Sequence, residues 1–163
     1  MAQINKEYLQ SGLGVLRIFL LPNIFGLLVS LSCTNDYDTN FYTPLTIALI
    51  FTFVSIVCVL SLSIFLLRLF NFMEKYPNFP WETTFFLIDL ITWGLLIYIW
   101  VQAILGVSDD HNKKVNQDAY WAAIVMGLFA VLINGVIIRL KITKAMGCNF
   151  MCIPNECNQD EGC

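Results

Sequence analysis

The stretch LTIALIFTFVSIVCVLSLSIFLLRLF, residues 45–70, decides the fold. Its only charged residue is Arg68, close to its end. A helix needs about 20 apolar residues to cross a hydrocarbon core roughly 30 Å thick, and this run is longer than that. Only helices and closed barrels satisfy their backbone groups in lipid. Because the run is too long for a barrel strand and does not alternate in polarity, it predicts a membrane-spanning helix.

Three further apolar runs predict three more spans. Of all residues, 58% are hydrophobic and only 13% are charged, whereas soluble domains are about half apolar and a quarter charged. We therefore expect an all-α integral membrane protein, a four-helix transmembrane bundle with spans at about residues 12–32, 44–70, 82–107 and 119–140. The first run is interrupted by Arg17 and Asn23, but it is long for a signal peptide and lacks a small-residue cleavage site. It is therefore interpreted as a span.

The distribution of basic residues predicts the orientation, because cytoplasmic ends of spans are enriched in Lys and Arg. One side of the predicted bundle carries seven of the nine: Lys6, Arg17, Arg68, Lys75, Arg139, Lys141 and Lys144. The other side has Lys113 and Lys114. Both termini should thus be cytoplasmic. We expect a cytoplasmic N-terminal segment at 1–11, the transmembrane domain at 12–145 and a cytoplasmic Cys-rich tail at 146–163.

Two charges lie well inside the predicted spans, away from the span ends, where charges are costly and usually face protein or water. Asp89 lies about two turns into the third span, or about 10 Å deep at 1.5 Å per residue. Arg17 lies at a similar depth from the same side, so the two should approach each other as an intramembrane polar pair. Such a pair either fixes helix register or forms a proton or ion site. The second reading has less support, because no other carboxylate and no His lies in the interior of any span.

Small residues recur on the last span, where they permit close helix approach in lipid. Ala119, Ala123 and Gly127 follow one another at spacings of four, and Gly135 comes two turns later. This row predicts a helix-packing face. It serves either the chain's own bundle or a partner helix.

The tail contains four cysteines, of which two follow the last span closely. Cys148 and Cys152 lie a few turns beyond the basic residues at 139–144, a position typical of S-palmitoylation. They are candidate acylation sites, with free thiols as the alternative. A zinc site is disfavoured, because the cysteine spacings are unlike well-separated Cys-X2–4-Cys pairs. No metal or other cofactor is predicted.

Several function classes find no support in the sequence. It lacks a Gly-rich phosphate loop, a His-Glu-X-X-His motif and a Gly-X-Ser-X-Gly elbow, and it contains one His. We therefore predict that the chain is not an enzyme. Its net charge of −3 is small and spread out, so no nucleic-acid partner is expected.

The arrangement resembles the MARVEL-domain family of four-span proteins, the MAL, plasmolipin and chemokine-like-factor group. The residues PW at 80–81 followed by IDL at 88–90 resemble the start of that family's third span. The stretch AAIVMGLFA, residues 122–130, resembles its small-rich fourth span, and Arg17 resembles the basic residue near the start of its first. The resemblance covers roughly residues 12–145. The Cys-rich tail departs from it.

The resemblance implies a non-enzymatic, membrane-organising or vesicle-trafficking role, exerted through lipid association and oligomerisation. The partners it implies are membrane lipids, rich in cholesterol and sphingolipid, and further copies of the chain. The expected location is the plasma membrane or a vesicular or other endomembrane. The alternative is an accessory subunit of a larger complex with a channel, receptor or transporter as its membrane-protein partner. An ion- or proton-conducting protein that uses Asp89 is the third reading.

Overall fold

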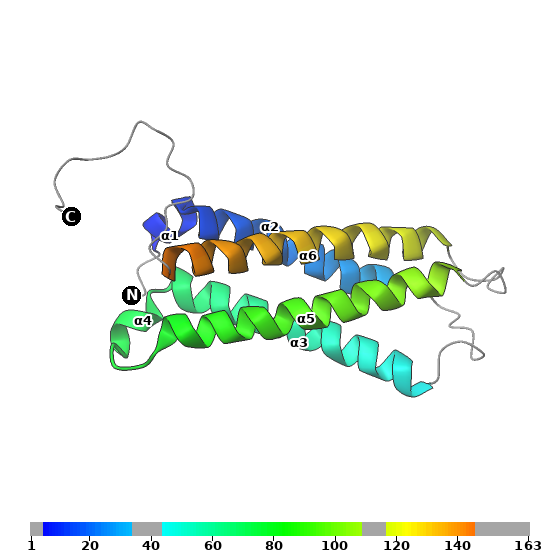
Figure 1. Cartoon of the computed structure of the whole chain (residues 1–163), viewed down its shortest axis with the longest axis horizontal. Helices are drawn as coiled ribbons and strands as arrows, with labels where there is room; N and C mark the ends of the chain where they lie inside the picture. Colours follow the sequence, from blue (N-terminus) through cyan, green and yellow to red (C-terminus); the bar gives the residue numbers. More distant parts are fainter. Residues whose placement is uncertain (1–4, 34–43, 109–116, 146–163) are drawn as a thin grey trace.

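The computed structural model describes residues 5–33, 44–108 and 117–145. In these residues the regular structure is entirely helical (Figure 1). The six helices are α1 (Lys6–Gln10), α2 (Gly12–Ser32), α3 (Pro44–Leu69), α4 (Phe72–Lys75), α5 (Trp81–Ser108) and α6 (Gln117–Ala145).

The four long helices form an up-and-down bundle. Each packs against two neighbours, in the order α2, α3, α5, α6 and back to α2. All four are long and apolar enough to cross a membrane. This is the architecture of an integral, multi-pass membrane protein. The helices α1 and α4 lie at the end of the bundle where α2 and α5 begin and α3 and α6 end (Figure 1). We call this the terminal end, and the half next to it the terminal half; the other is the distal half. Assignment of the terminal end to the cytoplasm stays a prediction.

The helix ends differ from the predicted spans mainly at the last helix. The sequence places its end at Leu140, but α6 continues to Ala145 and so includes Lys141 and Lys144. The loop predicted between the second and third spans contains the short helix α4, and the N-terminal segment contains α1. Charged residues near a span end lower its hydropathy without breaking the helix, so hydropathy ends the span too early.

The interior is a stripe of positions spaced alternately three and four residues apart, as in coiled coils. On α5, for example, the buried positions are Phe85, Asp89, Thr92, Leu96, Ile99 and Ala103. Matching stripes run along α2 from Arg17 to Leu31 and along α3 from Ile50 to Ile64. The outward faces are also apolar, and Phe19 is 59% exposed beside the fully buried Leu20. Both faces must be apolar, because one meets lipid and the other meets protein.

Helix α1 is docked against the terminal end. The backbone N–H of Asn5 donates to the carbonyl of Leu69, and its side-chain amide donates to Asn71 Oδ1, at 2.8 Å each. Asn5 also caps α1 by accepting from the N–H of Tyr8. The close turn into α2 requires Gly14, since a Cβ there would lie 1.9 Å from the carbonyl oxygen of Tyr8. Residues 5–11 are therefore part of the folded unit.

Candidate functional site

The structure brings the predicted pair together inside the bundle. Arg17 on α2 donates from Nη2 to Asp89 Oδ1 on α5. Asp89 is fully buried and Arg17 is 2% exposed. The pair therefore lies between helices, away from the lipid-facing surface, as expected of charges within a membrane span.

A third charge, Lys141 on α6, completes the site. Its Nζ lies 2.5 Å from Asp89 Oδ2, so each carboxylate oxygen accepts from a different cation. Sequence reasoning assigned Lys141 to the cytoplasmic flank and missed this contact. The spacing in the sequence could have indicated this contact. Lys141 lies seven residues after Asn134, which places both on the same face of a helix, two turns apart.

Polar side chains extend the site one turn deeper. Thr92 Oγ1 donates to the carbonyl of Asp89 at 3.0 Å, and Asn134 Nδ2 donates to that carbonyl and to Thr92 Oγ1, both at 3.2 Å. Among the described residues, no partner reaches Arg17 Nη1 or Asn134 Oδ1, although both atoms are buried. The network ties α2, α5 and α6 together at one level.

Nearer the terminal end, Arg68 of α3 adds a second ion pair. Its Nη2 lies 2.9 Å from Glu82 Oε2 on α5, and its guanidinium lies 5.0 Å from the ring centroid of Phe85 and 5.8 Å from that of Tyr8. The Tyr8 hydroxyl is buried without a hydrogen-bond partner in the described residues. Burial raises the pKa of this phenol, while the charges of Arg17 and Arg68 act in the opposite direction.

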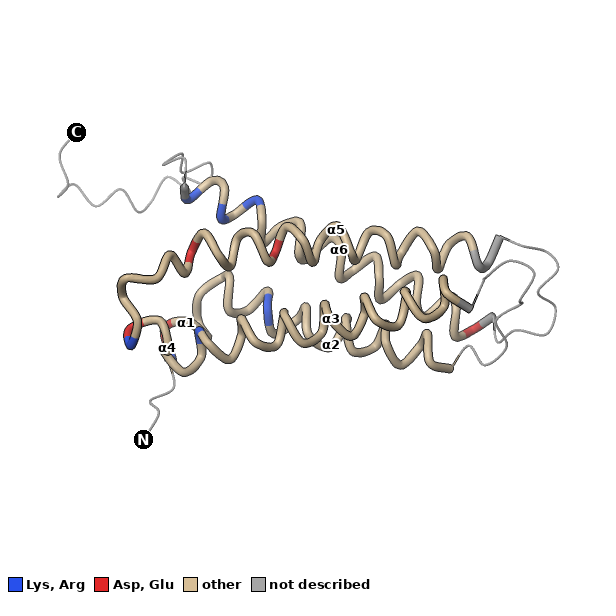
Figure 2. The backbone as a smooth tube through the Cα atoms, turned by 90° about the horizontal axis from the view of Figure 1, so that it is seen from below, with Lys and Arg blue, Asp and Glu red and all other residues tan. Residues whose placement is uncertain are grey.

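All four spans and α1 thus contribute to one polar cluster, which we define as Tyr8, Arg17, Arg68, Glu82, Asp89, Thr92, Asn134 and Lys141. Figure 2 shows the wider pattern: charged residues gather in the terminal half, and in the described residues the distal half has one, at the start of α6. Because both oxygens of Asp89 are held by cations from different helices, the geometry favours a register-fixing network over a conducting site.

The predicted small-residue row packs within the chain. A Cβ on Gly127 would lie 3.1 Å from Trp100 Cδ1, and one on Gly135 would lie 3.4 Å from Trp93 Nε1. Both indoles belong to α5 and donate to α6 carbonyls at 3.1 Å, Trp93 to Val131 and Trp100 to Ile124. Ala123 is fully buried and Ala119 is 8% exposed. In the described residues this row packs against α5 and α2 of the same chain.

The candidate acylation sites Cys148 and Cys152 lie outside the described residues. Their modification stays a prediction from sequence.

Comparison with known proteins does not assign the chain to a family. No family model matches the chain, and no curated protein or solved structure matches it either. The MARVEL resemblance therefore rests on the residues that suggested it.

Proposed function

We propose that this protein is a non-enzymatic membrane organiser of the vesicle-trafficking type, acting through lipid association and oligomerisation. The observation that carries the proposal is the length of its spans. Three of the four candidate spans have 25 residues or more, or about 38 Å at 1.5 Å per residue. A typical hydrocarbon core is roughly 30 Å thick.

Long spans favour thick bilayers, because each ångström of mismatch carries a small cost that still sorts proteins between membranes. Thicker membranes are those rich in sterol and sphingolipid. The span α3 is the clearest case, since its residues from Leu45 to Leu67 are uncharged. Tilt or local bilayer thickening are the competing ways to accommodate the excess.

The lipid-facing surface supports the same role. Large apolar side chains point outward from all four spans, among them Phe19, Val59, Ile91 and Phe129, each more than half exposed. Arg17, Asp89 and Lys141 are instead paired in the interior of the bundle. The chain thus presents an apolar exterior to lipid or to further copies.

The test is partitioning of the purified chain between coexisting thin and thick domains of giant vesicles. We expect enrichment in the thick domain. Leu45→Ser with Leu49→Ser shortens the apolar length of α3 by about a turn at lipid-exposed positions and should reduce the enrichment. The matched control is Ile56→Ser with Val59→Ser, which makes the same polarity change on the lipid-facing side at mid-span. Equal partitioning of the unaltered chain would contradict the proposal.

Gentle solubilisation and sizing separate this proposal from the accessory-subunit alternative. Homo-oligomers or lipid-rich particles support the membrane organiser. A stoichiometric complex with a larger membrane protein supports the accessory subunit.

A further inference from the structure

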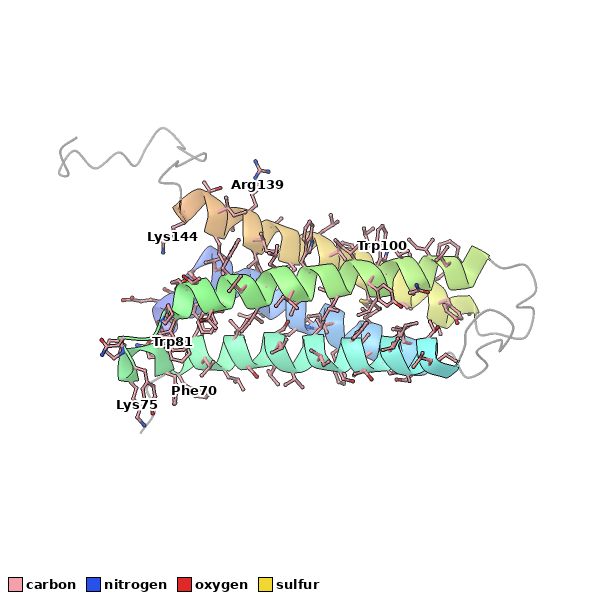
Figure 3. All side chains as sticks on the ribbon, turned by 60° about the horizontal axis from the view of Figure 1, so that its bottom comes forward. Phe70, Lys75, Trp81, Trp100, Arg139 and Lys144 are labelled. Atoms are coloured by element: carbon pink, nitrogen blue, oxygen red, sulfur yellow. The ribbon has the colours of Figure 1, made fainter. Side chains whose placement is uncertain are left out.

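A groove at the terminal end is lined by residues of all four spans. It has a volume of about 520 Å³, and its lining includes Arg68, Glu82, Phe86, Lys141, Ile142 and Lys144. Figure 3 shows Lys144 pointing from the end of α6 toward the other helices, whereas Arg139 points away from the bundle. The groove is therefore basic where α6 ends and apolar along Phe86 and Ile142.

The charge in and behind the groove is not balanced. Arg68 pairs with Glu82, and Arg17 and Lys141 share the single carboxylate of Asp89. Lys144 has no ion-pair partner among the described residues. Four positive side chains thus face two carboxylates, which leaves a formal excess of two positive charges.

The depth of the groove indicates the kind of ligand. Lys144 is the last residue of the candidate span, and Lys141 lies one turn inside it, on the same side of the helix. A ligand held there has its anionic group at the membrane interface, while Phe86 and the 38%-exposed Ile142 offer apolar contact. Basic pockets between spans are suited to anionic lipid head groups.

We propose that this groove binds an anionic phospholipid of the leaflet at the terminal end, with a preference for head groups that carry about two negative charges. The phosphate contacts Lys144 and Lys141, and Arg68 offers the planar donors that suit phosphate oxygens. The carboxylate of Glu82 repels the phosphate and so limits the affinity for the lipid. This site names the class of lipid with which the protein associates. It therefore deepens the proposed function and rests on the lipid association proposed there.

The test is native mass spectrometry of the full chain in micelles titrated with phosphatidic acid or with phosphatidylcholine of the same acyl chains. We expect selective binding of phosphatidic acid. Lys144→Gln should weaken it about fivefold, the effect of one basic residue near the surface. Glu82→Gln should strengthen it by a similar factor, because it removes the opposing carboxylate.

Two controls carry the same charge change as Lys144→Gln at the same end of the molecule. Lys75 stacks beside Phe72 and Tyr76, and Arg139 points away from the bundle, so Lys75→Gln and Arg139→Gln should leave binding unchanged. Losses in these variants equal to that in Lys144→Gln would overturn the site, since they indicate unspecific attraction. An unchanged affinity in Lys144→Gln would also overturn it.

Competition with glycerol phosphate distinguishes a lipid from a soluble ligand, because it has the head group of phosphatidic acid without the chains. No competition supports the lipid, and competition at the concentrations at which phosphatidic acid binds overturns it. The result is separable from the thickness test. Selective binding without enrichment in thick domains contradicts the proposed function alone, and enrichment without selective binding contradicts this site alone.

Discussion

The two halves of the bundle use the same helical spacing with different chemistry. In the terminal half the interior stripe includes Arg17, Asp89, Asn134 and Lys141, linked by ion pairs and hydrogen bonds. In the distal half it consists of apolar and small residues, among them Leu27, Ile50, Val54, Ile99, Ala103 and Ala123. There, the indole of Trp100 lies over Gly127 and donates to a backbone carbonyl.

The difference shows how a bundle is specified when every helix face is apolar. Lipid is as apolar as the side chains, so no hydrophobic force selects which face turns inward. In the terminal half, selection comes from charges that are too costly to expose to lipid. In the distal half it comes from small residues that permit close packing and from indoles that reach across the interface. One half is held by polar pairing, and the other by shape.

The largest expected effect comes from removing the charge of Asp89. Asp89→Asn keeps the shape but leaves Arg17 and Lys141 buried without a counter-charge. We expect a loss of about 3–5 kcal/mol in the free energy of unfolding, typical of breaking a buried ion pair. Unfolding of the purified protein in mixed micelles with a denaturing detergent measures it.

The matched control is Glu82→Gln, two turns earlier on the same helix. The Glu82 side chain is 68% exposed, so its pair with Arg68 should contribute less than about 1 kcal/mol. If the two variants lose equal stability, the polar cluster does not hold the terminal half together, and the comparison between the halves fails.

The next effect tests packing in the distal half. In Gly127→Ala the added Cβ would lie 3.1 Å from Trp100 Cδ1, so the Trp100 side chain must move by a few tenths of an ångström. We expect a loss of about 1–3 kcal/mol, typical of overpacking. Gly94→Ala is the control, because nothing lies within 4 Å of its Cβ and the better helix propensity of Ala remains.

A double-mutant cycle makes this test specific. In a Trp100→Ala background the ring atom Cδ1 that crowds the added methyl group is gone, so Gly127→Ala should cost clearly less than in the unaltered chain. An unchanged cost would show that the glycine matters for some contact other than the indole.

Sequence reasoning predicts the spans well because it needs only length and apolarity. It predicts poorly which side of each helix faces the core. Neighbours such as Phe19 and Leu20 are equally apolar, yet Phe19 meets lipid and Leu20 lies in the core. An amphipathic pattern is absent, and the polar residues are the remaining markers. Arg17 and Asp89 were predicted as a pair for that reason, since equal depth from one side limits where they can lie.

The rest of the site depends on tertiary geometry. A Lys near a span end ordinarily reaches toward water, and only the antiparallel register of α5 and α6 brings Lys141 to Asp89. The same register brings Trp93 and Trp100 to carbonyls on α6. Tyr8 was missed because α1 has five residues and its burial depends on the close turn at Gly14.

The smallest expected effect concerns Tyr8, whose buried phenol belongs to the terminal half but forms no hydrogen bond within the described residues. Tyr8→Phe should change stability by less than about 1 kcal/mol at neutral pH, because no hydrogen bond is lost. At high pH the phenol should matter. Burial raises its pKa above the ordinary value of 10.0, so the folded chain keeps this proton to higher pH than the unfolded chain.

The phenol's contribution is thus fully present below pH 10 and is lost as pH rises through the folded-state pKa. The slope is at most about 1.4 kcal/mol per pH unit for one group. The measurement is the difference in unfolding free energy between the unaltered chain and Tyr8→Phe across this range, which cancels the titration of lysines. Tyr76→Phe is the control, because Tyr76 is 50% exposed and meets water in either state. If the difference in unfolding free energy between the two chains does not change with pH, α1 leaves the terminal end before the bundle unfolds. Tyr8 then does not belong to the polar half, which would begin at Arg17.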